Sequence, residues 1–152
     1  MSKFSVDMDK NRIHRCVFNA QLWNNKKGIY SENINVMLDT GSFTTSIYKP
    51  FVSQYGTMLN EKMSVALGGQ QIEANLCVLH KLNIGGHVME KVVALAIPFG
   101  GELREHILLG TNVTNNWKFT VSRQENNLSA VEQGSFYRYC YNMQGQVLSF
   151  QE

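Results

Sequence analysis

The chain has 152 residues, of which 43% are hydrophobic and 17% are charged. This length and composition are typical of one globular domain that buries a core without disulfides or metal, and they exclude two full domains. The 14 Lys and Arg residues nearly balance the 12 Asp and Glu residues, and no window gathers the basic residues into a stripe. We therefore expect neither nucleic acid nor an acidic membrane surface as a partner.

Cysteines and histidines give no sign of a metal or disulfide site. Cys16, Cys77 and Cys140 form no CxxC pair, and the four histidines show neither HExxH nor another close ligand spacing. The first 15 residues are polar, unlike a secretory signal, and no apolar run approaches the roughly 20 residues that span a bilayer. We expect a cytoplasmic protein with no metal, no organic cofactor and no membrane association.

Alternation of apolar and polar residues, with many β-branched and aromatic side chains, dominates from Cys16 onward and predicts an all-β domain of short strands. In chain order, strands are predicted at residues 13–23, 29–38, 44–48, 63–67, 71–84, 88–97, 118–122 and 128–132. Glycine pairs at 68–69 and 85–86 predict the tight turns of a meander. An apolar run at 107–109 precedes Gly110.

Two short helices are predicted among these strands. Pro50 suits the first position of a helix and Gly56 suits its C-terminal cap, while residues 111–117 could form the second helix. We assign residues 1–133 to the domain and residues 134–152 to an aromatic-rich extension that packs on the domain or on a dimer partner. A further hairpin is expected in this extension around residues 144–146.

Asp39 is the most conspicuous candidate for chemistry, since it is the only aspartate after Asp9. It follows an apolar strand and precedes Thr40 and Gly41, so that the glycine can allow a sharp turn while the carboxylate projects from the end of the strand. Thr40 can lend its hydroxyl to a neighbouring main chain. The same three residues are also common in ordinary turns, so alone they are only a moderate signal of a catalytic site.

The order of segments around this motif resembles the retropepsin-like aspartic proteases, the single-lobe family that includes the retroviral proteases. Residues 36–42 (VMLDTGS) look like the catalytic loop of that family. Residues 63–84, turning at Gly68 and Gly69, resemble its flap hairpin and the strand that leaves it. The run 107–110 (ILLG), with a short helix after it, resembles the segment behind the catalytic loop. The resemblance covers about residues 16–132.

Three positions depart from the viral pattern. Viral members often have alanine after the catalytic glycine and an Asp/Arg pair that ties this loop to the following helix, whereas this chain has Ser42, Phe43 and Thr111. Ser42 is closer to the pepsin-type pattern, in which its hydroxyl can lie near the carboxylate.

The resemblance implies an all-β, retropepsin-like acid-protease barrel with one or two short helices, acting as a homodimer on peptide or protein substrates. Aspartic proteolysis needs two carboxyl groups that share a proton, and one chain supplies only one such motif, so Asp39 of a second copy completes the dyad. By this resemblance Asp39, Thr40 and Gly41 are catalytic, and Ser42, Leu67, Gly68 and Gly69 contact substrate.

Two other interpretations remain open. The chain could keep the fold and its DTG loop but serve as a catalytically silent dimerisation or peptide-binding module. It could also be a plain structural β domain in which DTG is only a turn.

Overall fold

The computed structural model describes residues 2–12, 15–67, 69–98, 105–134, 139–141 and 147–149. The strands are β1 (Ser2–Asp7), β2 (Val17–Asn24), β3 (Ile29–Tyr30), β4 (Ile34–Leu38), β5 (Thr45–Tyr48), β6 (Gly56–Leu67), β7 (Gln70–Ile84), β8 (His87–Ile97), β9 (Ile107–Leu109), β10 (Trp117–Ser122), β11 (Asn127–Glu132), β12 (Tyr139–Tyr141) and β13 (Val147–Ser149). The helical turns are η1 (Lys49–Phe51), α1 (Val52–Tyr55) and α2 (Thr111–Thr114). Strands make up 63% and helices 9% of the structure, which confirms the all-β prediction.

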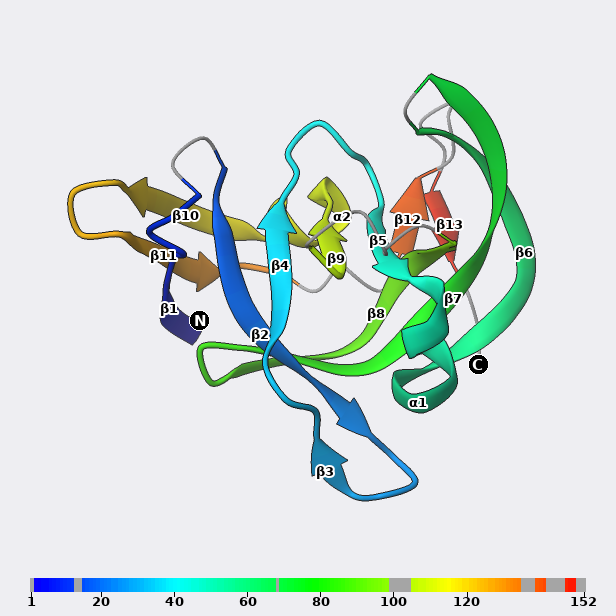
Figure 1. Ribbon diagram of the computed structural model, residues 1–152, viewed down its shortest axis with the longest axis horizontal. Coiled ribbons are helices and arrows are strands. Elements are labelled where there is room, and N and C mark those ends of the chain that lie inside the picture. Colours follow the sequence, from blue (N-terminus) through cyan, green and yellow to red (C-terminus); the bar gives the residue numbers. More distant parts are fainter. Residues whose placement is uncertain are drawn as a thin grey trace.

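Six strands close into a barrel in the order β2, β4, β9, β5, β8 and β7, and β7 then pairs back with β2. β3 extends this sheet beyond β2, and β6 extends it beyond β7. Figure 1 shows β6 and β7 as a long curved hairpin that rises beside the loop joining β4 to β5. A separate sheet with the order β1, β11, β10 lies on the opposite side of the molecule.

β8 is apolar on both of its faces. Val92, Ala94 and Ala96 belong to the main core cluster, whereas Val93 and Leu95 belong to a second cluster with residues of β7. Because successive side chains of a strand point to opposite faces, both faces of this strand are covered. β12 lies against β8 and α2, so part of the C-terminal extension lies near this strand. The expected turn at residues 144–146 lies outside the described residues, and the division at residue 133 stays a prediction.

The polar start of the chain contains a strand that the sequence analysis missed. β1 pairs antiparallel with β11, from Ser2 opposite Glu132 to Asp7 opposite Asn127. Its buried Phe4 stacks on His87 with ring centroids 4.5 Å apart and meets Trp117 edge to face. One buried aromatic in a run of six residues is too weak an alternation to be distinguished from a polar tail.

The single strand predicted at 29–38 is wrong, because the chain leaves the sheet between β3 and β4. There Ser31 keeps the hydrogen bonds to β2. Its N–H donates to the Leu22 carbonyl over 2.8 Å, and its hydroxyl accepts the Leu22 N–H over 3.0 Å. A serine hydroxyl can satisfy a backbone donor in this way, so the strand can break without loss of hydrogen bonds.

The helix predicted after Pro50 forms, with the proline in its first turn. Gly56 caps α1 as predicted, since its N–H donates to the Val52 carbonyl. Its φ of −157° is extended, and it also begins β6, seven residues earlier than predicted. A Cβ at Gly56 would lie 2.6 Å from the Val78 carbonyl oxygen, so close strand approach explains the glycine. α2 is shorter than predicted because Trp117 already belongs to β10.

Candidate active site

Asp39 lies directly after β4, where that strand runs parallel to β9. Its N–H donates to the Leu109 carbonyl over 2.9 Å, which continues the pairing of the two strands by one residue. One side-chain oxygen, Oδ1, accepts the Gly41 N–H over 3.2 Å, and the residue is half-buried. The carboxylate is therefore held at the end of a rigid strand and keeps access to solvent.

The other residues of the Asp-Thr-Gly motif lie on the solvent-exposed side of the turn that follows β4. Thr40 and Gly41 are exposed, and the Gly41 backbone is not in the left-handed region. The nearest atom to a Cβ built at Gly41 is the Asp39 Oδ1, at an ordinary contact distance of 3.5 Å. The expected turn forms, because Thr40 and Gly41 are turn residues and the Ser42 N–H donates to the Asp39 carbonyl over 3.3 Å. Its backbone could nevertheless carry a side chain at Gly41. The Ser42 hydroxyl donates to the Thr44 carbonyl over 2.8 Å rather than to the carboxylate.

A buried polar network holds the inner side of residues 39–44, which we call the catalytic loop after the role that the sequence predicts for it. Asn112 Oδ1 accepts both the N–H and the hydroxyl of Thr45, each over 2.8 Å. Its amide nitrogen donates to the Val93 carbonyl over 2.9 Å, and its backbone N–H donates to the Phe43 carbonyl over 3.0 Å. The Thr45 hydroxyl in turn accepts the Gly110 N–H over 3.0 Å. Asn112 of α2 thus joins the loop through its backbone N–H, and β5 and β8 through its side-chain amide.

Sequence reasoning missed Asn112 and Thr45. Asparagine shortly after a glycine, here two residues after Gly110, is typical of an exposed turn, yet Asn112 is 1% exposed. The apolar run that precedes Gly110 was the only signal of burial. Gly110 was recognised, and the structure explains it: an added Cβ would lie 2.5 Å from the Thr44 carbonyl carbon. Thr44 is also buried, and its hydroxyl has no hydrogen-bond partner among the residues that the structure describes.

The predicted flap is the hairpin of β6 and β7, in which Leu67 pairs with Gln70. Gly69 has a φ of +82°, as the tight turn requires. Gly68 and the Leu67 side chain lie outside the described residues, so their predicted contacts with substrate stay predictions.

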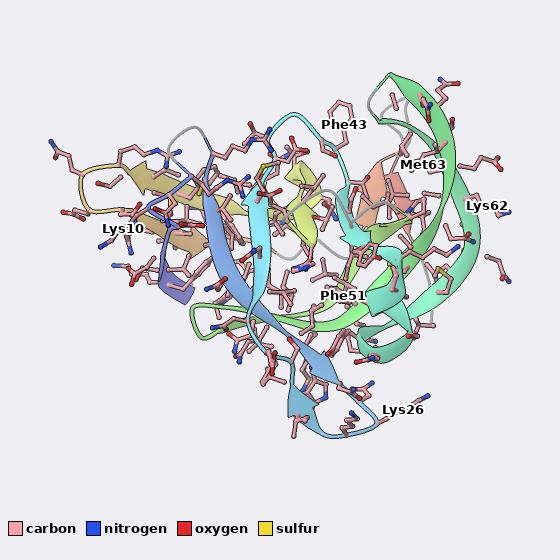
Figure 2. The ribbon with its side chains drawn as sticks, in the orientation of Figure 1. Lys10, Lys26, Phe43, Phe51, Lys62 and Met63 are labelled. Atoms are coloured by element: carbon pink, nitrogen blue, oxygen red, sulfur yellow. The ribbon has the colours of Figure 1, made fainter. Side chains whose placement is uncertain are left out.

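A pocket of about 370 Å³ separates this hairpin from the catalytic loop. Gly41, Ser42 and their two following neighbours line one wall, and residues 63–66 of β6 line the other. Figure 2 shows Phe43 on the loop and Met63 on the side of β6 that faces it, whereas Lys62 points outward from the hairpin. The structure therefore brings Gly41 and Ser42 of the predicted site and the stem of the predicted flap to one cleft. Asp39 and Thr40 do not line this cleft, but Asp39 is linked to it through the Gly41 N–H.

Cys16 and Cys77 are poor nucleophiles. Burial raises the pKa of the Cys77 thiol to about 12. Burial also raises the pKa of Cys16, although the nearby Arg123 opposes this shift. Both thiols therefore remain protonated at neutral pH. Within the described residues no three His, Cys, Asp or Glu side chains gather into a metal site. The described helices include none that is long and apolar enough to cross a membrane.

Comparison with known families agrees with this geometry. A family model described as aspartyl protease matches residues 26–113, which is more than half of the chain. The matched segment contains the catalytic loop, the β6–β7 hairpin, β8, β9 and Asn112. The resemblance to retropepsin-like aspartic proteases is thereby confirmed. No curated protein matches the chain significantly.

Proposed function

Because this chain belongs to the aspartyl protease family, we propose that it is a homodimeric aspartic endopeptidase in which each of two copies contributes Asp39. The observation that carries the proposal is the position of this carboxylate. It is fixed at the end of β4, accessible beside a cleft, and the Gly41 N–H is its one hydrogen-bond donor among the described residues. A second carboxylate, which the chemistry needs, has to come from another copy.

In the proposed reaction the two Asp39 carboxyl groups hold one proton and one water between them. The ionised group accepts a proton from the water as it attacks the scissile carbonyl, and the protonated group donates its proton to the carbonyl oxygen. The same pair then returns a proton to the leaving amine. Activity is expected to favour acid or mildly acid solution, since the rate falls when neither carboxyl keeps its proton.

The substrate peptide lies in the cleft as an extended strand. The catalytic loop borders it on one side and the β6–β7 hairpin on the other, and main-chain hydrogen bonds hold it in place. The hairpin tip, with Leu67, Gly68 and Gly69, closes over the reacting bond and the attacking water and excludes bulk solvent. Gly41 supports this arrangement. Neither its φ nor a close neighbour among the described residues requires a glycine at this position. The absence of a side chain would, however, allow a peptide or a second copy to approach the backbone closely.

Subunit mixing tests the dimeric mechanism. Asp39→Asn is nearly isosteric, so it is expected to keep the fold and the dimer while abolishing peptide cleavage. If each site needs both aspartates, activity after subunit exchange declines with the square of the wild-type fraction at constant total protein. The exposed Asp7→Asn is the matched control and is expected to leave activity unchanged.

A linear decline on mixing would contradict the shared dyad. Asp39→Asn protein that is folded and still cleaves a peptide library at the wild-type rate would exclude aspartic catalysis altogether. A folded wild-type dimer that binds peptides and cleaves none of them would favour the catalytically silent module instead.

A further inference from the structure

The sheet of β1, β11 and β10 has one face turned to solvent, on the side of the molecule away from the β6–β7 hairpin (Figure 1). Its other face covers the core, since Phe4, Leu128 and Ala130 are buried. Successive side chains of a strand point to opposite faces, so the residues between these share the solvent face. An open groove of about 600 Å³ lies on this outer face. The outer-face side chains that line the groove are Lys3, Ser5, Lys118, Thr120, Ser129 and Val131.

The strand register places these side chains in two rows. Lys3 lies opposite Val131 of β11, and Val131 lies opposite Lys118 of β10, so that two lysines flank one apolar side chain. Neighbouring strands lie about 4.8 Å apart, which separates the backbones of the two lysines by about 10 Å. The second row consists of three hydroxyl side chains, Ser5, Ser129 and Thr120.

The positive charge of the groove is not balanced within the described part of the chain. Neither Lys3 nor Lys118 forms an ion pair with a described acidic residue. The three strands contain two acidic residues, Asp7 and Glu132. Glu132 is largely buried and pairs with His87, while Asp7 lies four residues from Lys3 along β1, which is about 13 Å. No acidic residue lines the groove, so both lysines can bind an external anion.

The number and the spacing of these charges favour a peptide as the ligand. Surfaces that bind nucleic acid or anionic membranes usually gather at least about four basic residues, whereas this groove has two. In an extended peptide, residues two or four positions apart project to the same side and lie about 7 or 13 Å apart. Two carboxylates at either spacing are within reach of flexible lysine side chains about 10 Å apart. The neighbouring hydroxyl groups can bind the peptide main chain.

We propose that this groove binds an acidic, extended segment of a protein partner. The segment crosses the three strands along the first row, with one carboxylate on Lys3 and another on Lys118, and it covers Val131 between them. The hydroxyl row lies beside its main chain. The groove shares no lining residue with the cleft beside the catalytic loop. Binding here is therefore separate from cleavage, and the inference does not rest on the proposed function.

The test is the binding of labelled peptides to the full chain, followed by fluorescence anisotropy. The Asp39→Asn protein serves as the parent, so that no peptide is cut during the measurement. A short peptide of alternating Glu and Ser is expected to bind about tenfold more tightly than one of alternating Gln and Ser. Its affinity is expected to fall as the salt concentration rises, since salt screens exposed charge pairs.

Substitutions at the two lysines locate the binding. Lys3→Gln and Lys118→Gln are each expected to weaken the binding of the Glu peptide by about two- to fivefold, and both together by about tenfold. Reversal of both charges, by Lys3→Glu with Lys118→Glu, is expected to transfer the preference to a peptide of alternating Lys and Ser. All these positions are exposed, so the variants are expected to fold, which their Tm checks.

The matched control removes two other exposed lysines. Lys26 and Lys27 lie in the turn between β2 and β3, where Figure 2 shows Lys26 pointing away from the body of the protein. The double variant Lys26→Gln, Lys27→Gln has the same change in net charge and is expected to bind the Glu peptide as tightly as the parent.

Three results would overturn the inference. The first is equal affinity of the parent and the folded Lys3→Gln, Lys118→Gln variant for the Glu peptide. The second is tighter binding of an oligouridylate or of phosphatidylserine vesicles than of the Glu peptide, which would make the ligand a nucleic acid or a membrane. Lysines on edge strands can also prevent association between sheets. The third result is therefore a double variant that self-associates in sedimentation but keeps the affinity of the parent for the peptide.

Discussion

Two neighbouring threonines offer a sharp test of the network behind the catalytic loop. Thr44 and Thr45 are both buried, but within the described part of the chain the hydroxyl of Thr45 is hydrogen-bonded and that of Thr44 is not. Replacement by valine exchanges a hydroxyl for a methyl group of similar size in each case. Effects of volume and of strand propensity are therefore similar, and the difference between the two variants reports on the hydroxyl groups.

The expected effects have opposite signs. Thr45→Val leaves the buried Gly110 N–H without its acceptor, and an orphaned buried donor costs about 1–3 kcal/mol. Thr44→Val removes a hydroxyl that is buried without a partner, a state that itself costs about 1–3 kcal/mol. The free energy of unfolding should therefore fall by about 2 kcal/mol in Thr45→Val and rise by about 1 kcal/mol in Thr44→Val.

Thermal unfolding followed by the fluorescence of the buried Trp117 measures this difference. A gap of about 3 kcal/mol corresponds to about 6–12 °C in Tm for a chain of this length. All samples need the same protein concentration, because subunit association shifts the Tm. If both variants shift the Tm in the same direction by similar amounts, the network does not support the loop as described here.

Two further predictions follow from the glycines and from Cys77. Gly41→Ala is expected to change the free energy of unfolding by less than about 1 kcal/mol but to abolish cleavage, whereas Gly110→Ala should cost about 3 kcal/mol because its Cβ would meet the Thr44 backbone; urea unfolding and peptide cleavage measured on both variants check this pair. Burial keeps the pKa of Cys77 at about 12 against an ordinary 9.0, so the native state retains a proton that the unfolded state releases and stability is lost from pH 9 upward. Between pH 8 and 10.5 the wild type should lose about 2 kcal/mol more than Cys77→Ala does, and equal losses in urea unfolding would refute the assignment.

Much of the barrel could be predicted because its strands carry a local signal. Each of these signals can be recognised within about ten residues: the long apolar runs of β7 and β8, the paired glycines after β7, and the DTG motif after β4. The errors lie where a distant partner decides the structure. β1 is a strand because β11 pairs with it, and Gly56 is extended because Val78 lies against it.

The site was predicted in the same uneven way. Asp39 was visible because aspartate is rare in this chain and follows an apolar strand. The network of Asn112 and Thr45 was not, since its partners lie 67 residues apart in the sequence. Each residue alone is compatible with an exposed position on its predicted strand or helix, and only the closed barrel removes both from water.

The two sides of the catalytic loop therefore differ in what determines their residues. On the inner side, the N–H of Asp39 and the carbonyl groups of Ser42 and Phe43 are all hydrogen-bonded to β9 or α2. On the outer side, Thr40, Gly41 and the Phe43 ring are exposed, and nothing within the described chain requires their identity. Substitutions on the inner side should change the free energy of unfolding. Substitutions on the outer side should leave it nearly unchanged and alter cleavage, because in the proposed enzyme their partners are the substrate and the second copy.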